Sequence, residues 1–274
     1  MKNFKTGLQL YSVRDELQRD FESTIKEIAG MGYEYVEFAE FYADKNGEEI
    51  KALLDKYNLK CISVHQEIDL FLQKGQEAID FFKAFGVKYW VVPWYSPDAL
   101  AGTDKWEETK ATFTKLGNAL RDNGMQLLYH NHEFEFNKFE GKYLIDHLFD
   151  DIPNDLILPE FDTCWIKYAG EDSCKYIEKF AGKIEVLHLK DFVCDSLNAG
   201  PVYALIGGSD APSKKVNNFK FRPCGSGLQD FEAIIKSADI AGVEYLIVEQ
   251  DNWYENNSLD EAKKSREYLK TLGI

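Results

Sequence analysis

Cysteine is scarce in this chain, and its spacing is not that of a bonded or metal-binding set. The five cysteines are odd in number, lie far apart and form no Cys-x-x-Cys pair. This pattern favours neither a disulfide framework nor a thiolate zinc site. We therefore expect reduced thiols, as in a cytoplasmic protein, at Cys61, Cys164, Cys174, Cys194 and Cys224.

Long apolar runs are absent as well. No stretch of the sequence approaches the ~18 consecutive apolar residues of a membrane span. The first residues, Met1 to Lys5, lead straight into a strand-like segment without the apolar region of a secretion signal. We expect neither membrane insertion nor secretion.

Basic residues are too few for a nucleic-acid partner. The chain has 32 Lys and Arg against 47 Asp and Glu, a net charge of −15, and no local basic stripe. Such a balance repels polyphosphates. In contrast, 45% hydrophobic and 14% aromatic residues supply ample material for the core of a globular protein.

Helix and strand patterns alternate along the whole chain. Amphipathic stretches, for example 21–28, 78–85 and 106–120, are followed by glycine helix stops and then by short apolar runs. Strands are expected at 6–11, 34–38, 60–64, 88–92, 126–131, 156–161, 185–189 and 245–249, with a last helix over 258–272. Eight such units predict a TIM barrel in the α/β class. A doubly wound sheet, the alternative, often carries a Gly-rich loop after its first strand, and Leu10 to Arg14 has none.

One stretch, 192–223, is rich in Asn, Ser, Gly and Lys and has no clear periodicity. We interpret it as an irregular insertion after the seventh strand, within a single domain over residues 1–274, and its position is that of a lid. The glycines that follow, in Pro223 to Gly227, predict an ordinary turn rather than a phosphate-binding loop.

Four of the apolar runs end in imidazole or carboxylate groups. His130 ends the fifth expected strand, Asp162 the sixth, His188 the seventh and Glu249 the eighth. Such groups are costly to bury alone, and the strand ends of a barrel converge at one rim. A hydrogen-bonded structural role must be invoked separately for each residue, whereas one divalent cation accounts for all four. The mixed nitrogen and oxygen donors suit Mn, Zn, Co or Fe.

Further side chains are expected at the same rim. Alternation along each strand places Glu160 and Lys190 on the faces that carry the predicted metal ligands. A hydroxylated ligand would be contacted by polar groups and by flat aromatic walls, and the candidates are Glu37, His65, His132, Trp94 and Trp165. Each of these has an alternative role as a buried hydrogen-bond partner or a core side chain.

The strand ends also carry motifs that occur together in one superfamily. They are YHNH (129–132), EFDT (160–163), LHLKD (187–191) and VE (248–249), with GSG at 225–227. They resemble those of the sugar phosphate isomerase/epimerase superfamily with a xylose isomerase-like TIM barrel, and the similarity covers essentially the whole chain. The resemblance implies a divalent cation held by Glu, Asp, His and Glu from strands five to eight, and glutamates that move protons beside a carbonyl.

Asp162, His188 and Glu249 match three of the four ligand positions that the resemblance implies. His130 stands where the first glutamate is expected. A histidine can still bind the metal, but it does not replace a carboxylate as a proton acceptor of the same basicity. Glu160 or Glu133 is then the candidate for that role.

We therefore expect a metal-dependent sugar isomerase or epimerase that removes a proton next to a carbonyl and passes through an enediolate. The expected catalytic residues are Glu249, Glu160 and Lys190, and the expected cofactor is one divalent ion, Mn, Zn, Co, Mg or Fe. One alternative is a lyase or dehydratase that uses the same site on a keto-sugar with a leaving group beta to the carbanion. Another is a sugar-binding barrel without activity.

A metal-dependent endonuclease is disfavoured, because five histidines and a charge of −15 suit neither a multi-metal cluster nor a phosphate backbone. The expected ligand is a small sugar or keto-polyol. The sequence leaves open which sugar it is, whether it is phosphorylated, which metal is bound, and whether the chain forms a homo-oligomer.

Overall fold

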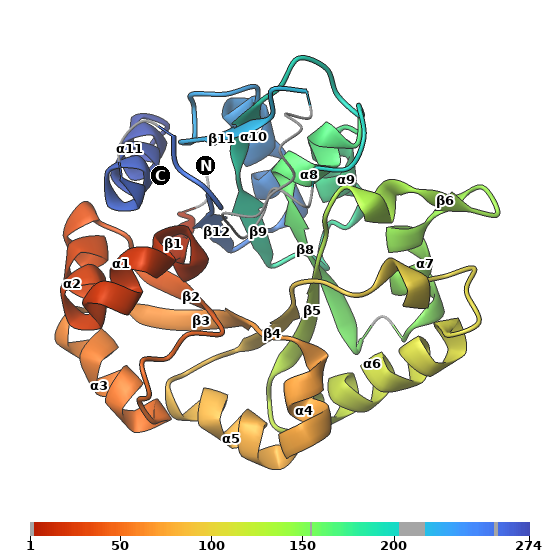
Figure 1. Cartoon of the computed structure of the whole chain (residues 1–274), viewed down its shortest axis with the longest axis horizontal. Helices are drawn as coiled ribbons and strands as arrows, with labels where there is room; N and C mark the ends of the chain where they lie inside the picture. The colour runs from red at the N-terminus through yellow and green to blue at the C-terminus, as the bar shows by residue number, and fades with distance from the viewer. Residues whose placement is uncertain (1–2, 154, 203–216, 255–256) are drawn as a thin grey trace.

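The computed structural model describes residues 3–153, 155–202, 217–254 and 257–274. Eight parallel strands close into a barrel in the order β1, β12, β9, β8, β5, β4, β3, β2 (Figure 1). Their bounds are β1 Lys5–Gln9, β2 Tyr35–Ala39, β3 Lys60–His65, β4 Tyr89–Val92, β5 Gln126–His130, β8 Ile157–Asp162, β9 Val186–Leu189 and β12 Tyr245–Val248. The predicted TIM barrel is confirmed.

Helices form a ring around this barrel (Figure 1). They are α1 Arg14–Arg19, α2 Phe21–Met31, α3 Gly47–Lys56, α4 Ile68–Lys74, α5 Gln76–Ala84, α6 Trp106–Asp122, α7 Leu144–Asp151, α8 Thr163–Tyr168, α9 Ser173–Lys179, α10 Phe231–Ala241 and α11 Ser258–Thr271, with short 3-10 turns at Leu10–Val13, Pro97–Ala99 and Phe134–Phe136. None of the helices within the described ranges is long and apolar enough to cross a membrane.

Local sequence signals set the ends of the helices. The side chain of Asp20 accepts a hydrogen bond from the backbone N–H of Ser23 and caps the start of α2. The same helix ends at Gly32, whose φ of 94° is a left-handed conformation that favours glycine. Gly242 ends α10 in the same way, with φ 86°. The predicted glycine stops therefore direct the chain from each helix into the next strand.

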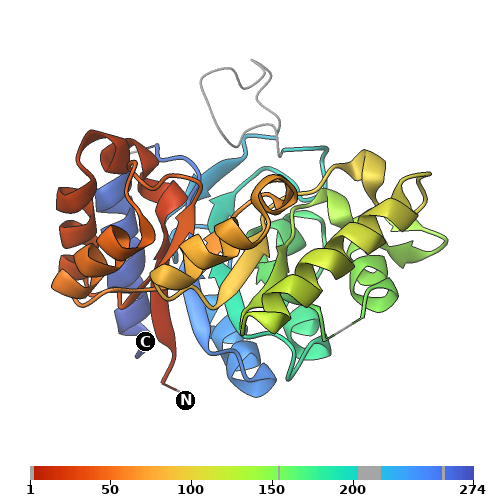
Figure 2. The ribbon, with the colours of Figure 1, turned by 90° about the horizontal axis from the view of Figure 1, so that it is seen from below.

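Apolar and aromatic side chains close the barrel interior at the end where the strands begin. One buried cluster consists of Tyr35, Ile62, Tyr89, Val91, Leu128, Val186, Tyr245 and Ile247. Space there is tight, since a Cβ on Gly7 would lie 2.6 Å from Cδ1 of Ile247. Figure 2 shows both chain termini at this end of the molecule. Polar side chains that point into the barrel farther along the strands therefore rest on an apolar floor.

The segment after β9 leaves the barrel and returns to it. Strands β10 (Asp191–Val193) and β11 (Lys220–Arg222) pair antiparallel, and a second small pair is formed by β6 (Lys138–Phe139) and β7 (Lys142–Tyr143). Phe219 stacks on Trp165 of α8, with ring centroids 5.9 Å apart. Residues 203–216 of the predicted insertion lie outside the described residues, so its role as a lid stays a prediction.

Candidate active site

The four predicted metal ligands converge at the C-terminal rim of the barrel. His130 ends β5, Asp162 ends β8, His188 lies in β9 and Glu249 follows β12. Their ligand atoms lie within 4.8 Å of one another, and all four side chains are buried. Parallel strands bring these groups together because the same face of each strand points into the barrel.

A second, overlapping set of potential ligands lies beside the first. His130 and His188 are joined there by His65 from β3 and by Glu160 from β8, again within 4.8 Å. The carboxylate oxygen Oε2 of Glu160 lies 2.7 Å from His65 Nε2, and 3.2 Å from both His130 Nδ1 and His188 Nε2. The rim therefore holds a continuous layer of imidazoles and carboxylates, which we call the polar layer.

Glu37 of β2 lies beneath this layer and is fully buried. Its carboxylate accepts hydrogen bonds from Gln9 Nε2 at 2.8 Å and from the hydroxyl of Ser63, and lies 2.7 Å from His188 Nε2 and 3.0 Å from His65 Nε2. Burial would raise the pKa of Glu37, but the charges of His65 and His188 and their hydrogen bonds hold it well below its ordinary value. Glu37 is thus a charged partner of the histidines.

A bulge in β3 brings His65 into this arrangement. Val36 pairs with Cys61 and Glu37 pairs with Ser63, so Ile62 is an extra residue opposite β2. The bulge turns Ile62 into the barrel and still leaves Ser63 in contact with Glu37. Bulges of this kind re-aim side chains at functional rims.

Lys190 is the buried cation of the site. Its Nζ atom lies 3.0 Å from Asp162 Oδ2, 2.8 Å from Glu249 Oε2 and 3.0 Å from Asp251 Oδ2. The side chain is 1% exposed, and the rings of Trp165 and Phe221 lie 5.1 Å and 5.6 Å from Nζ. Burial opposes the charged form, but the three carboxylates raise the pKa of Lys190 well above its ordinary value.

The pKa values of the carboxyl groups around Lys190 are shifted in different directions. Burial would raise the pKa of Glu249, yet Lys190 and His188 lower it below its ordinary value. Burial raises the pKa of Asp251 to about 7 against the opposing charge of Lys190. Asp251 was not among the predicted site residues, although it follows Glu249 by two positions and so extends the same strand face.

The histidines fall into two pairs. Burial opposes protonation of His65 and His188, but neighbouring carboxylates raise the pKa of His65 to about 10 and that of His188 well above its ordinary value. Burial, together with the charges of nearby histidines and Lys190, lowers the pKa of His130 and His132 well below the ordinary value. Burial and the charge of Glu37 raise the pKa of Glu160 to about 7.

The loop after β5 is held by polar groups that the sequence analysis did not single out. Glu135 accepts hydrogen bonds from the hydroxyl of Tyr129 and from the backbone N–H of His132, both at 2.8 Å. The side chain of Asn131 accepts from the backbone N–H of Asp162 at 3.0 Å. These contacts hold His130, at the end of β5, and His132, in the following loop, against β8.

The predicted turn after β11 encloses an acidic side chain of the protein itself. The carboxylate of Asp191 accepts hydrogen bonds from the backbone N–H groups of Gly225 at 3.0 Å, Gly227 at 2.8 Å and Gln229 at 3.1 Å. These donors are the kind that a phosphate would use. Since Asp191 takes them, the loop anchors the residue next to Lys190.

A cavity of about 440 Å³ opens above the polar layer. Its wall includes His65, His130, His132, Lys190, Glu249 and Asp251, with Trp94 on the rim. Glu160 and Glu37 are fully buried below this wall. Trp165, expected as an aromatic wall, is also fully buried, because it packs on Phe219 and beside the ammonium of Lys190.

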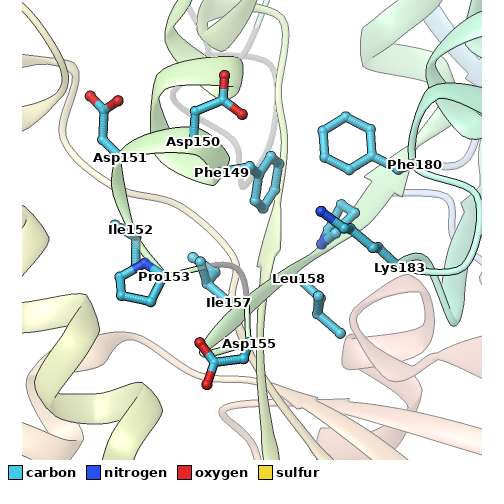
Figure 3. Close-up of a pocket in the computed structure, with 11 residues that line it drawn as sticks. Phe149, Asp150, Asp151, Ile152, Pro153, Asp155, Ile157, Leu158, Phe180 and Lys183 are labelled. Atoms are coloured by element: carbon cyan, nitrogen blue, oxygen red, sulfur yellow. The ribbon is translucent and has the colours of Figure 1, made fainter.

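A cavity of about 500 Å³ opens at the opposite end of the barrel, where β8 begins (Figure 3). Three carboxylates in it already have partners outside it: Asp150 with Lys142, Asp151 with Trp106, and Asp155 with Arg121. Figure 3 shows these three carboxyl groups pointing in different directions rather than toward one point. The candidate site is therefore the one at the C-terminal rim.

Several known proteins are similar to this chain. An inosose dehydratase from Clostridium perfringens is 26% identical over 278 residues, which cover 92% of this chain and 90% of that protein. A sugar phosphate isomerase/epimerase from Parabacteroides distasonis superposes with a TM-score of 0.78 at 20% identity, covering 98% of this chain and 94% of its own. An L-ribulose 3-epimerase superposes with a TM-score of 0.66 at 16% identity, covering 98% and 94%. These two structures share the fold.

The family assignment rests on the length of the match as well as on the site. Residues 25–272 match the xylose isomerase-like TIM barrel family, a span that contains all the imidazoles and carboxylates of the polar layer. The closed barrel and the ligand set at its rim agree with this match. The chain is an enzyme and belongs to the xylose isomerase-like TIM barrel family.

Proposed function

We propose that this enzyme is a dehydratase that eliminates water from a keto-sugar or keto-polyol. The inosose dehydratases that align over 92% of the chain support this lyase hypothesis, which the sequence analysis held as the alternative to isomerisation. Inosose is a cyclic polyol with one ketone. A proton next to that ketone is acidic, and a hydroxyl on the following carbon is the leaving group.

The polar layer fits a divalent cation. It contains imidazole and carboxylate donors within 4.8 Å of one another, and Oε1 of Glu160 is buried without a hydrogen-bond partner among the described residues. We propose that His130 and His188, which belong to both candidate ligand sets, hold the cation together with neighbouring acidic residues. When bound, the cation would polarise the ketone and make the adjacent C–H more acidic.

Proton removal is assigned to Glu249. This carboxylate lines the cavity, and the nearby positive charge of Lys190 keeps it ionised. Glu160, the other candidate base of the sequence analysis, is fully buried below the cavity wall, and we assign it to the cation rather than to the substrate. The C–H electron pair then becomes the enolate of the substrate.

Lys190 is assigned as the acid that releases the leaving group. Its ammonium lines the cavity 2.8 Å from Glu249, and it gives a proton to the departing hydroxyl, which leaves as water. The enolate electrons form the new carbon–carbon double bond. The proton that Glu249 took passes across the same 2.8 Å contact to the neutral Lys190, so both residues return to their starting forms.

The observation that carries the proposal is this adjacent acid and base on the cavity wall. Elimination of water needs one group that accepts a proton from carbon and one that donates a proton to oxygen. Glu249 and Lys190 supply both from neighbouring strands. We expect His132 and Trp94 to contact the hydroxyls and the ring of the substrate, since both line the cavity.

Incubation with inosose and Mn²⁺ in deuterated water tests the reaction. We expect loss of one water by mass spectrometry and the ultraviolet absorbance of a conjugated ketone. Deuterium uptake without loss of water would instead support an epimerase or isomerase. Calorimetric binding without either change, for inosose and a panel of keto-sugars, would support a sugar-binding barrel and contradict the proposal.

A variant pair tests the role of Lys190. Lys190→Met should lower kcat for water loss by roughly 10²–10⁴-fold, the usual contribution of a positioned proton donor. Deuterium exchange at the carbon next to the ketone should persist at a measurable rate, since Glu249 remains. Lys175→Met, on a side chain that is 83% exposed, is the matched control and should keep full activity. Equal activity of the two variants would exclude Lys190 as the acid.

A further inference from the structure

We infer that the cation of this enzyme is held by His65, His130, Glu160 and His188, and not by the set with Asp162 and Glu249 that the family pattern predicts. The inference rests on the proposed function in one respect, which is that the enzyme binds a divalent cation. In this assignment one part of the polar layer binds the metal, and Glu249 with Lys190 transfers protons.

Three histidines converge on the carboxylate of Glu160. Three imidazole nitrogens, one from each of His65, His130 and His188, surround the single oxygen Oε2 of Glu160 at 2.7 Å, 3.2 Å and 3.2 Å. The four residues come from strands β3, β5, β8 and β9, so they approach one point from different sides. Separations of this size are those between ligands of a common ion with bonds of about 2.1 Å.

The other oxygen of the Glu160 carboxylate also indicates a cation. Oε1 of Glu160 is buried and has no hydrogen-bond partner among the described residues, and the side chain is 0% exposed. Buried carboxylate oxygens are normally paired, because desolvation without a partner is costly. A cation beside Glu160 would compensate this group.

The ligand set that the family pattern predicts, His130, Asp162, His188 and Glu249, already holds a positive charge; we call it the family set. The ammonium of Lys190 lies 3.0 Å from Asp162 and 2.8 Å from Glu249, the two carboxylates that would bind the ion. Lys190 is 1% exposed at the cavity wall, and the rings of Trp165 and Phe221 lie 5.1 Å and 5.6 Å from its Nζ, so little water reaches the ammonium. A divalent ion between these carboxylates would lie beside the ammonium in a site with little water to screen the repulsion.

The ring of His188 lies between carboxylates. A ligating histidine usually donates its other ring N–H to a carboxylate, which fixes the ring. Nδ1 of His188 lies 2.9 Å from Glu249, which can accept its proton, and Nε2 lies 2.7 Å from Glu37 and 3.2 Å from Glu160. In the inferred set Nε2 is the ligand, and it would exchange its contact with Glu37 for the cation. Glu37, held by Gln9 and Ser63, then adds a second negative charge next to the ion.

The donor set defines the class of metal. Three imidazoles and one carboxylate suit Zn, Co, Fe or Mn, whereas Mg prefers oxygen ligands and retained water. We therefore expect Co²⁺ and Zn²⁺ to bind and Mg²⁺ not to compete at millimolar concentration. Glu249, no longer a metal ligand, remains available to accept the proton of the substrate.

Co²⁺ titration of the chelator-treated protein tests the assignment without any substrate. Calorimetry and visible absorbance give the Kd for the wild type and four variants. His65→Ala and Glu160→Gln should weaken Co²⁺ binding by more than the ~10–100-fold that is typical of residues outside the ligand shell. Asp162→Asn should change the Kd by less than about tenfold. His130→Ala, common to both sets, is the positive control and should lose binding.

The opposite order would overturn the inference: loss of Co²⁺ binding in Asp162→Asn, with Kd preserved in His65→Ala and Glu160→Gln. Circular dichroism checks that each variant folds. If Glu160→Gln does not, X-ray absorption of the Co²⁺-loaded wild type decides, because the inferred set contains three imidazoles and the family set only two. These readouts do not depend on whether inosose is dehydrated, so failure of the proposed reaction leaves them unaffected.

Discussion

Glu135 shows how a single buried carboxyl group couples this site to pH. It is 1% exposed, accepts hydrogen bonds from Tyr129 and from the backbone of His132, and has a pKa that burial raises to about 8. The folded protein thus binds this proton more tightly than the unfolded chain does. The contribution to stability is complete below the ordinary pKa of 4.5 and is lost as the pH rises toward 8.

Glu135→Gln removes this ionisation and should change the pH profile of stability. Between about pH 5 and pH 9, the free energy of unfolding of the wild type should fall relative to that of the variant, by on the order of 4 kcal/mol. Urea unfolding of both proteins at the two pH values measures the difference. Glu77→Gln, on a side chain that is 74% exposed, is the control and should follow the wild type. Parallel profiles for the wild type and Glu135→Gln would contradict the raised pKa.

Which side chains meet at the rim was predictable from the sequence, but their pairing was not. Strand ends with His130, Asp162, His188 and Glu249 predicted a shared site because parallel strands converge, and the structure brings their ligand atoms within 4.8 Å. The three carboxylates around Lys190 belong to Asp162, Glu249 and Asp251. Their contacts with Lys190 depend on distances between strands, and residue spacing along the chain does not give those distances. Lys190 was singled out only by its place on the same face as His188.

At the scale of the element, the bulge of β3 explains part of what the sequence pattern missed. Strict alternation would put Ile62 and Val64 on one face and Ser63 on the other. In the structure, Ile62 joins the interior cluster while Val64 packs outside it, and Ser63 still reaches Glu37. An extra residue in a strand leaves no mark on composition or periodicity over so short a run. The sequence therefore placed Glu37 and His65 at the same rim, but it could not predict the pairing of Glu37 with Ser63 or the inward turn of Ile62.

The turn at Gly225 to Gln229 has no room for a side chain at Gly227. A Cβ on Gly227 would lie 2.3 Å from Oδ1 of Asp191 and 2.4 Å from the carbonyl oxygen of Phe192. Gly227→Ala should therefore displace the turn from the Asp191 carboxylate and destabilise the protein by about 1–3 kcal/mol. Lys190, the neighbour of Asp191, should shift with it, so we also expect a lower kcat.

Gly30→Ala is the matched control for this prediction. A Cβ there meets nothing within 4 Å, and the residue lies inside α2. Alanine is the better helix former, so this variant should be stabilised by about 0.5–1 kcal/mol. Thermal and urea unfolding compare the two substitutions. A Gly227→Ala variant as stable as the wild type would mean that the turn does not need glycine.

At the scale of the whole molecule, the barrel was the most predictable feature. Eight apolar runs, each except the first after a helix that ends in glycine or a polar turn, leave few other arrangements, because a right-handed parallel connection is nearly obligatory. The described part of the 192–223 stretch forms a strand pair and an aromatic cluster rather than a barrel element. Its composition has no period, so the sequence could mark its position but not its conformation.

The buried polar layer also predicts that metal binding stabilises the entire barrel. The candidate ligands come from β3, β5, β8, β9 and the exit of β12, so a bound ion would link strands from much of the circumference. A ligand that binds only the folded state adds about 2.7 kcal/mol at a concentration of 100 times its Kd. For a domain of this size, that corresponds to an increase in Tm of roughly 5–10 °C. Thermal unfolding of chelator-treated protein with increasing Co²⁺ measures it.

His130→Ala separates this specific effect from general effects of salt, because His130 belongs to both candidate ligand sets. Without its imidazole, either set has three ligands, and the increase in Tm with Co²⁺ should be lost. His147→Ala is the matched control, since His147 lies on α7, contacts Asp151 and the carbonyl oxygen of Phe139, and belongs to neither ligand set. An equal increase in Tm for both variants would place the stabilising ion elsewhere in the molecule, and a role of the rim in metal binding would then be untenable.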